Sequence, residues 1–207
     1  MLLPTAFYRR PDPVLIAREL LGKVLVSEVD GLRTTGRIVE TEAYSHVGDR
    51  ACHSHLGRFT ERTKVMYAPG GVAYTYLVYG LHTLFNVITN EAGHADAVLI
   101  RAVAPLEGIP TMLARRGLSA VARNLTAGPG LLTQAMGISR RHYGLDLTLG
   151  QEIWIEDDGM PVPDDGEVVA SPRVGIAYAG EDAALPWRFR LKNSPWTSRA
   201  GGRGGRC

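Results

Sequence analysis

The sequence is poor in cysteine: among its 207 residues only Cys52 and Cys207 carry a thiol. Two cysteines cannot form the disulfide framework of a small secreted domain, and they favour a reducing compartment. No apolar run approaches the roughly 18 residues that a membrane-spanning helix needs, and no signal peptide opens the chain. We therefore expect a soluble intracellular protein with no membrane partner, in the cytoplasm or nucleoid if the source is bacterial.

Internal repeats are also absent, and the hydrophobic content of 45% is ordinary for a globular protein. A chain of 207 residues can bury a core without disulfides or metals, and it fits one domain or at most one and a half. Residues 199–207 are rich in Gly and Arg, and we expect them to be a disordered tail. The sequence thus predicts a single domain over residues 1–198.

Acidic residues are scarce in three long stretches, although the net charge is only +2. Residues 50–64 hold four basic residues against one acidic, residues 99–145 six against one, and residues 173–207 seven against two. Residues 152–167 hold seven acidic residues and no basic one. Such a chain can present one basic side, as a polyanion binder does, although Arg residues scattered over a solvated surface would give the same composition.

The sequence also lacks a full set of His and Cys residues at the spacing of metal ligands. His53 and His55 lie next to Cys52, but no second His or Cys pair follows at the spacing of a zinc site. We therefore expect no metal.

Against these absences, the run from Gly36 to Tyr44 places two carboxylates in a β-rich segment. Side chains on a strand alternate between its faces, so four residues are predicted to share one face: Ile38, Glu40, Glu42 and Tyr44. This face is solvated, or its carboxylates pair with a nearby arginine such as Arg37, or it belongs to a functional site.

Caps and turns predict the other elements. Asp12-Pro13 and Gly22 bracket a short helix at 14–21, and Asp30-Gly31 predicts a hairpin of strands 23–29 and 32–44. The remaining pattern predicts a second hairpin of strands 72–78 and 83–89, helices at 109–117 and 129–137, and strands at 96–104 and around 152–156, 167–178 and 187–191. Arg101 interrupts an apolar strand, and because a buried unpaired charge is costly, we expect it to pair with Glu42 or Glu40.

The second hairpin carries aromatic residues on one face and at its tip. Tyr74 and Tyr76 share a face, toward which Asn86 on the returning strand can point. Tyr79 lies at or beside the tip, where an aromatic side chain has no core to enter. It is either a plain turn residue or a wedge for the minor groove of DNA.

The connection at 45–69 is long and polar, so it is functional or contains an element that the pattern does not reveal. Its basic and hydroxyl side chains suit phosphate contacts, with a merely solvated loop as the alternative: Arg58, Thr60, Arg62 and Lys64.

Several blocks closely resemble the alkyladenine (3-methyladenine) DNA glycosylase family, and they occur in order from about residue 18 to residue 196. They are RIVETEAY at 37–44, ACHS at 51–54, YTYLVYG at 74–80, Asn86, LIRA at 99–102, PLEG at 105–108 and SPRVGIAYAG at 171–180. The resemblance implies an α+β fold, a single mixed domain around a curved, mainly antiparallel sheet with a protruding β-hairpin and short flanking helices.

The resemblance also implies a monofunctional glycosylase that flips alkylated or deaminated purines from duplex DNA and hydrolyses the N-glycosidic bond, which starts base excision repair, without metal or cofactor. We expect a monomer. In the family roles, Glu42 activates a water and is held by Arg101 and the backbone of Val174. The other roles form the base pocket and the DNA wedge: Tyr44 and His53 on one wall, Tyr76 on the other, Asn86 against the 2-amino group of guanine, and Tyr79 in the minor groove.

Two other interpretations stay open. A non-catalytic protein that binds damaged DNA would use the same pocket and wedge, and a small-molecule hydrolase or transferase would leave Tyr79 as a turn residue. The chain also departs from the family pattern in a slightly longer loop at 90–96 and in His55 and Phe59 among the phosphate-binding positions. These departures leave the substrate range and the affinity for DNA open.

Overall fold

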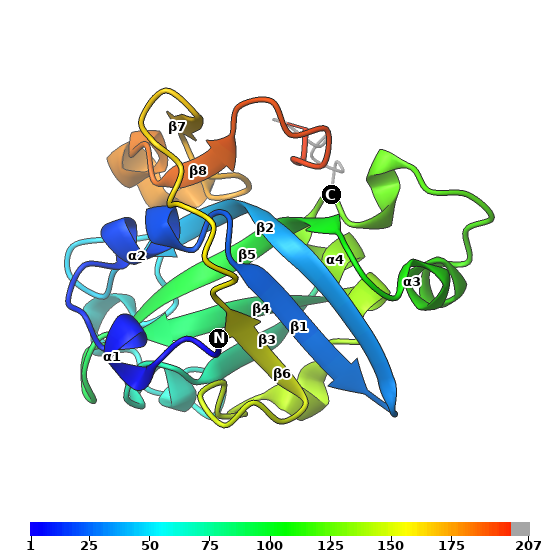
Figure 1. Cartoon of the computed structure of the whole chain (residues 1–207). Helices are drawn as coiled ribbons and strands as arrows, with labels where there is room; N and C mark the ends of the chain where they lie inside the picture. Colours follow the sequence, from blue (N-terminus) through cyan, green and yellow to red (C-terminus); the bar gives the residue numbers. More distant parts are fainter. Residues whose placement is uncertain (200–207) are drawn as a thin grey trace.

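One antiparallel sheet organises the computed structural model, which describes residues 1–199 (Figure 1). Its main path runs β3-β4-β5-β2-β1-β6, and β8 pairs with both β2 and β7. The eight strands are β1 Val24–Val29, β2 Leu32–Tyr44, β3 Ala73–Val78, β4 His82–Thr89, β5 Asp96–Pro105, β6 Ile153–Glu156, β7 Val168–Ser171 and β8 Arg188–Leu191. The tail predicted at 199–207 lies, apart from Arg199, outside the described residues.

Short helices flank the sheet, as Figure 1 shows. The α-helices are α1 Thr5–Tyr8, α2 Pro13–Glu19, α3 Ile109–Arg116 and α4 Pro129–Met136, and the 3-10 helices are η1 His55–Gly57, η2 Lys64–Tyr67, η3 Arg123–Leu125, η4 Arg140–His142 and η5 Ala177–Ala184. This mixture confirms the predicted α+β class. Within residues 1–199 no helix is long and apolar enough to cross a membrane.

The caps and turns act as their residue types predict. The Asp12 carboxylate accepts hydrogen bonds from the backbone N–H groups of Val14 and Leu15, both at 2.9 Å, and so starts α2. Asp30 and Gly31 both have positive φ, 58° and 71°, as the turn between β1 and β2 requires. Both predicted hairpins are confirmed.

The main hydrophobic core lies between the sheet and the helices. It combines Leu25, Ile38 and Ile100 of the strands with Ile16 of α2 and Leu132 of α4, all fully buried. The Thr41 hydroxyl donates a hydrogen bond of 2.7 Å to the carbonyl of Ala17 and so ties α2 to β2. This contact helps to hold the strand that carries Glu40 and Glu42.

The strict alternation predicted for 38–44 is wrong at its start. Between Ile38 and Thr41 the pairing of β2 with β5 shifts register, as a β-bulge does. Ile38 therefore joins the main core together with Ala43, while Glu42 and Tyr44 line a cavity. The bulge separates Ile38 from the acidic residues that follow it.

Two further expectations need correction. The strand predicted over 167–178 ends at Ser171, because Pro172 has no N–H for the ladder and Gly175 has a φ of 78°. Residues 177–184 form the 3-10 helix η5 instead. The long connection at 45–69 also contains two elements that the pattern did not reveal, η1 and η2.

Candidate active site

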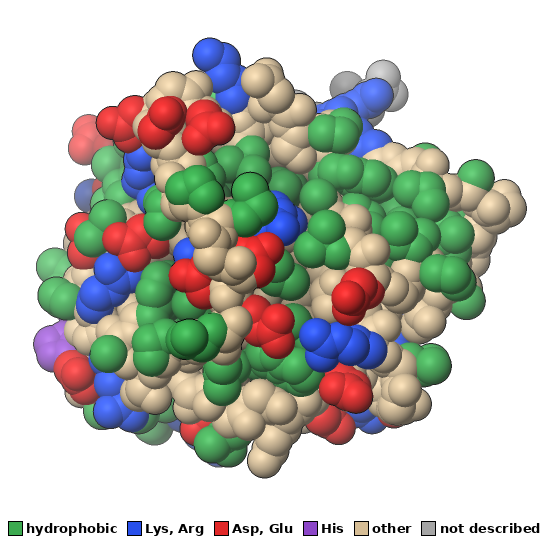
Figure 2. All heavy atoms as spheres, viewed as in Figure 1, with side chains coloured by type: hydrophobic (Ala, Val, Ile, Leu, Met, Phe, Trp, Pro, Cys, Tyr) green, Lys and Arg blue, Asp and Glu red, His purple; other side chains and the backbone are tan. Residues whose placement is uncertain are grey.

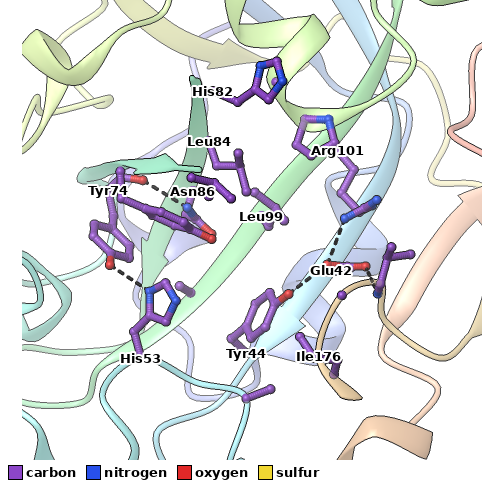
Figure 3. Close-up of a pocket in the computed structure, with 18 of the residues that line it drawn as sticks. Glu42, Tyr44, His53, Tyr74, His82, Leu84, Asn86, Leu99, Arg101 and Ile176 are labelled. Carbon is purple, nitrogen blue, oxygen red and sulfur yellow. Dashed lines mark hydrogen bonds and ion pairs between the residues drawn. The ribbon is translucent and has the colours of Figure 1, made fainter. Parts of the chain in front are cut away.

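A cavity of about 600 Å³ opens where β2 and β5 meet the β3-β4 hairpin, the start of α4 and the segment after β7 (Figure 3). It brings together the predicted catalytic and pocket residues and the tip tyrosine: Glu42, Tyr44, His53, Tyr76, Tyr79, Asn86, Arg101 and Val174. Of the four predicted phosphate contacts, the cavity lining includes Arg62 but not Arg58, Thr60 or Lys64.

The register of the sheet assembles this lining. Glu42 on β2 lies opposite Leu99 on β5, Leu99 lies opposite Asn86 on β4, and Asn86 lies opposite Tyr74 on β3. Directly opposed residues of antiparallel strands project from the same face, so these four side chains form a row across the sheet. All four line the cavity, although they are spread over 57 positions of the chain, from 42 to 99.

Glu42 is buried, and both carboxylate oxygens are held. Oε2 accepts a hydrogen bond of 2.8 Å from the Tyr44 hydroxyl and lies 3.2 Å from Nη1 of Arg101. Oε1 accepts a hydrogen bond of 2.8 Å from the backbone N–H of Val174. With a single bonded partner among the described residues, Oε1 keeps acceptor capacity toward the cavity.

Glu40 lies two residues away, is not among the residues that line the cavity, and accepts four hydrogen bonds. Its Oε1 accepts hydrogen bonds from Nε of Arg101 and Nε of Arg188, both at 2.8 Å, and from the Ser198 hydroxyl at 2.7 Å. Its Oε2 accepts one from the backbone N–H of Ser198 at 2.5 Å. Burial alone would raise the pKa of Glu40, but the charges of Arg101 and Arg188 outweigh it and lower the pKa. Arg101 thus pairs with both carboxylates that the sequence suggested.

The residue pair Arg173 and Asp49 was missed by the sequence analysis. Two nitrogens of the buried Arg173 guanidinium lie 2.6 and 2.8 Å from the two Asp49 carboxylate oxygens. The same guanidinium lies over the Tyr44 ring, 4.7 Å from its centroid, and so fixes both Tyr44 and the neighbouring N–H of Val174. The available signal was a charged residue directly before Val174 in the block SPRVG.

The aromatic residues form one continuous group. The ring centroid of His53 lies 4.8 Å from that of Tyr76 in an edge-on contact, and the ring nitrogen Nδ1 of His53 lies 2.8 Å from the Tyr74 hydroxyl. Burial lowers the pKa of His53 to about 4, with the charges of Arg62 and Arg58 adding to the effect, so the ring is neutral at pH 7. A purine stacked between two rings needs about 7 Å between their planes, so His53 or Tyr76 must move before one can enter between them.

Burial, followed by the negative charge of Glu42, raises the pKa of Tyr44 well above its usual value. The Tyr44 hydroxyl is therefore protonated at neutral pH and serves as a hydrogen-bond donor to Glu42. Asn86 projects to the cavity while its side-chain amide donates a 3.1 Å hydrogen bond to the Tyr74 carbonyl. Both side chains are thus held in place by a neighbour.

Tyr79 projects from the molecule at the tip of the β3-β4 hairpin, with 90% of its side chain exposed. Its φ of 53° and that of Gly80, 69°, turn the chain back into β4. For a residue other than glycine this left-handed conformation costs free energy, unless other contacts offset the cost. The exposed ring borders the mouth of the cavity.

The four predicted phosphate contacts are all exposed, but the structure does not gather them into one group. The Lys64 ammonium pairs with Glu61 at 2.7 Å, and the Thr60 hydroxyl lies 3.0 Å from that of Thr63. The Arg62 guanidinium lies over the Tyr76 ring, 4.7 Å from its centroid, at the cavity wall. Arg62 therefore contacts the cavity directly, while the other three residues are not part of its lining.

Comparison with known proteins gives this arrangement a family. The family model of methylpurine-DNA glycosylase matches residues 6–195. The chain is 45% identical to a protein of Alkaliphilus oremlandii over 96% of this chain and 100% of that protein. It is 44% identical to one of Methanocella arvoryzae over 95% and 96%, and 47% identical to one of Anaeromyxobacter dehalogenans over 96% and 87%. Each of these relatives carries the name "Putative 3-methyladenine DNA glycosylase".

A match over nearly the whole chain defines the class of protein, a hydrolase that acts on N-glycosyl bonds. The chain belongs to the methylpurine-DNA glycosylase family. The resemblance found in the sequence is thereby confirmed.

Proposed function

We propose that the protein excises damaged purines, alkylated ones such as 3-methyladenine and deaminated ones, from duplex DNA. The damaged nucleotide turns out of the helix into the cavity, where a water activated by Glu42 hydrolyses the N-glycosidic bond and starts base excision repair. The observation that carries this proposal is the buried Glu42 carboxylate, which faces an aromatic cavity of about 600 Å³ and keeps acceptor capacity on Oε1.

The reaction needs one general base and a group that stabilises positive charge on the sugar. As the bond between C1′ and the purine nitrogen breaks, its electrons leave with the base and the sugar passes through an oxocarbenium-like state. A carboxylate stabilises that charge, and it accepts a proton from the water whose oxygen bonds to C1′. Glu42 supplies both effects in this proposal, and its fixed position is supported by Tyr44, Arg101 and the N–H of Val174.

The aromatic lining suits an electron-poor or cationic base. The ring faces of Tyr44 and Tyr76 that Arg173 and Arg62 leave free attract positive charge, and such contacts contribute about 0.5–2 kcal/mol. The pKa of His53, lowered to about 4, leaves this ring uncharged at pH 7, so it does not repel an alkylated purine. Asn86 is assigned the role of crowding the 2-amino group of guanine, which discourages attack on the normal base.

Extrusion of a base costs a few kcal/mol and costs less when the base is damaged or mispaired. Tyr79 is assigned the role of filling the gap in the stack, which its 90% exposure at the hairpin tip supports. The loop residues Arg58, Thr60, Arg62 and Lys64 are assigned contacts to phosphates. The protein acts as a monomer in this proposal.

The face of the molecule that carries β1 holds acidic side chains (Figure 2), which would repel DNA. Figure 2 shows acidic side chains along the segment that links β6 to β7, on the face that carries β1. Two of them, Asp157 and Asp158, pair with Lys23 at 2.7 Å and Arg37 at 2.8 Å. These basic groups are therefore already engaged, which favours the cavity side as the DNA-binding surface.

Release of free base from single-lesion duplexes tests the proposal. A panel would carry 3-methyladenine, 7-methylguanine, hypoxanthine or ethenoadenine at one position, and products would be separated by chromatography. We expect free base and an abasic strand from at least one lesion. Tight binding of every lesion duplex without release of base would instead identify a non-catalytic protein that binds damaged DNA. Failure to bind any duplex at low salt would overturn the DNA assignment.

A further inference from the structure

A second hollow of about 510 Å³ lies beside the cavity and shares three lining residues with it: Arg62, Tyr76 and Leu77. It is bounded further by Glu61, Thr75, Arg140 and Tyr143. We call this hollow the β3 groove, because it follows strand β3. None of the roles assigned above uses Thr75, Arg140 or Tyr143.

The β3 groove has an excess of positive charge. Arg140 is exposed and has no acidic partner within 4.0 Å among residues 1–199, whereas the next residue, Arg141, pairs with Asp30 at 3.1 Å and Glu152 at 3.6 Å. Glu61, the acidic residue of the groove, is already paired with Lys64 at 2.7 Å. The guanidinium groups of Arg62 and Arg140 are therefore left to attract an anion.

Strand β3 is also at the end of the main sheet path, so one side of its backbone faces away from β4. At Ala73 this outer side is paired: its N–H donates to the Leu145 carbonyl at 2.8 Å and its carbonyl accepts from the Gly144 N–H at 2.9 Å. Backbone groups on a strand alternate in direction, so the N–H groups of Thr75 and Leu77 also point outward. Among residues 1–199 neither has an acceptor beyond the sheet.

Tyr143 holds the two sides of the groove together. Its hydroxyl lies 2.9 Å from the Glu61 carbonyl and accepts a hydrogen bond of 3.2 Å from the N–H of Val65. The loop that carries Arg62 is thereby fixed relative to η4, which carries Arg140. The segments that carry the guanidinium groups of Arg62 and Arg140 are therefore fixed relative to each other.

We propose that the β3 groove binds a phosphodiester group of the same DNA strand whose damaged nucleotide enters the cavity. Fixed guanidinium groups and backbone amide donors around a hollow match the acceptor oxygens of a phosphate. Because Tyr76 and Arg62 border both hollows, a strand with one nucleotide in the cavity passes over the groove. This inference rests on the proposed function, and it adds Arg140 and the backbone N–H of Thr75 to the DNA-binding groups.

The test measures binding of a single-lesion duplex by fluorescence anisotropy at several salt concentrations. Loss of one phosphate contact lowers the slope of log Kd against log salt concentration by about 0.9. When the salt concentration is raised from 50 to 200 mM, the factor by which affinity falls should therefore be about 3.5-fold smaller for R140Q than for wild type. R141Q is the matched control, since Arg141 is engaged by acidic partners, and its slope should equal that of wild type. An R140Q slope equal to that of wild type would overturn the proposal.

A second measurement locates the phosphate. Each phosphate of the lesion strand is replaced in turn by an uncharged methylphosphonate. At one position the replacement should weaken binding by wild type but not binding by R140Q. Equal losses for R140Q and wild type at every position would contradict the assignment.

The proposed function is scored separately in these samples. If wild type binds the lesion duplex but releases no base, the catalytic proposal fails while the groove is still judged by the slopes. If wild type releases base and the slopes of R140Q and wild type coincide, the groove proposal alone fails.

Discussion

Glu40 and Glu42 are bound by the same guanidinium group: Nε of Arg101 lies 2.8 Å from Glu40 Oε1, and Nη1 lies 3.2 Å from Glu42 Oε2. Arg188 provides Glu40 with a second cation at 2.8 Å. Two carboxylates thus face two guanidinium groups in a buried cluster. Glu42 lines the cavity whereas Glu40 does not and accepts four hydrogen bonds, and the proposal that Glu42 is the reactive acid rests on this difference.

Replacing Glu40 should destabilise the fold in a pH-dependent way. E40Q leaves the buried Arg101 and Arg188 with too little negative charge, and breaking a buried pair costs about 3–5 kcal/mol. The pKa of Glu40 is lowered in the folded protein, so its contribution is present above the ordinary value of 4.5 and is lost as the pH falls through the lowered pKa. Urea unfolding should therefore show a large difference from wild type at pH 7 that shrinks below pH 4.5. E61Q, at an exposed acid, should change stability by less than about 1 kcal/mol.

The Ser198 hydroxyl is expected to stabilise this cluster. S198A removes the 2.7 Å hydrogen bond to Glu40, and a hydrogen bond to a charged group contributes about 1.5–3 kcal/mol. We expect the free energy of unfolding to fall by that amount. S171A is the matched control, because the Ser171 hydroxyl has no partner among residues 1–199. Equal effects of the two substitutions would show that Ser198 does not anchor Glu40.

His53 should make the protein less stable in mild acid. Its pKa falls from 6.5 to about 4 on folding, so the unfolded chain binds the extra proton between these values and wild-type stability declines as the pH drops through this window. H53Q carries no such group, so its stability relative to wild type should improve between pH 6.5 and pH 4.5 in urea unfolding. A constant difference across that range would show that His53 titrates normally in the folded state.

Tyr79 should contribute to DNA binding without contributing to the fold. Y79S removes an exposed ring, so the melting temperature should stay unchanged, while affinity for a lesion duplex should fall roughly 5- to 100-fold, the range for loss of one aromatic stacking contact. L81S alters another exposed side chain of the same tip and serves as the control, with a smaller expected loss. Unaltered affinity of Y79S would exclude the wedge.

Much of the fold could be predicted because local residues determine it. Asp30-Gly31 imposes positive φ at a hairpin, and Asp12 caps a helix whatever the rest of the chain does. The strand predicted through Tyr178 failed where Pro172 removes a backbone donor. The alternation of β2 failed at a bulge whose position depends on its partner strand, which local pattern does not reveal.

The candidate site likewise contains residues that the sequence predicts and contacts that it does not. Glu42, Arg101 and Tyr76 could be named because they lie in ordered blocks that resemble a family. The contacts of Ser198 with Glu40 and of Arg173 with Asp49 join residues 158 and 124 positions apart, and nothing in either short segment points to the other. Such contacts depend on how the sheet brings distant segments together.

The most direct test of the account is a single-turnover assay of base release by wild type and E42Q on a duplex with one lesion. Because a general base contributes about 10²–10⁴ in rate, E42Q should release base at least about 100-fold more slowly. Its affinity for the lesion duplex, measured on the same samples, should stay close to that of wild type. Base release by E42Q at the wild-type rate would contradict the account, and so would an equal loss of release and binding.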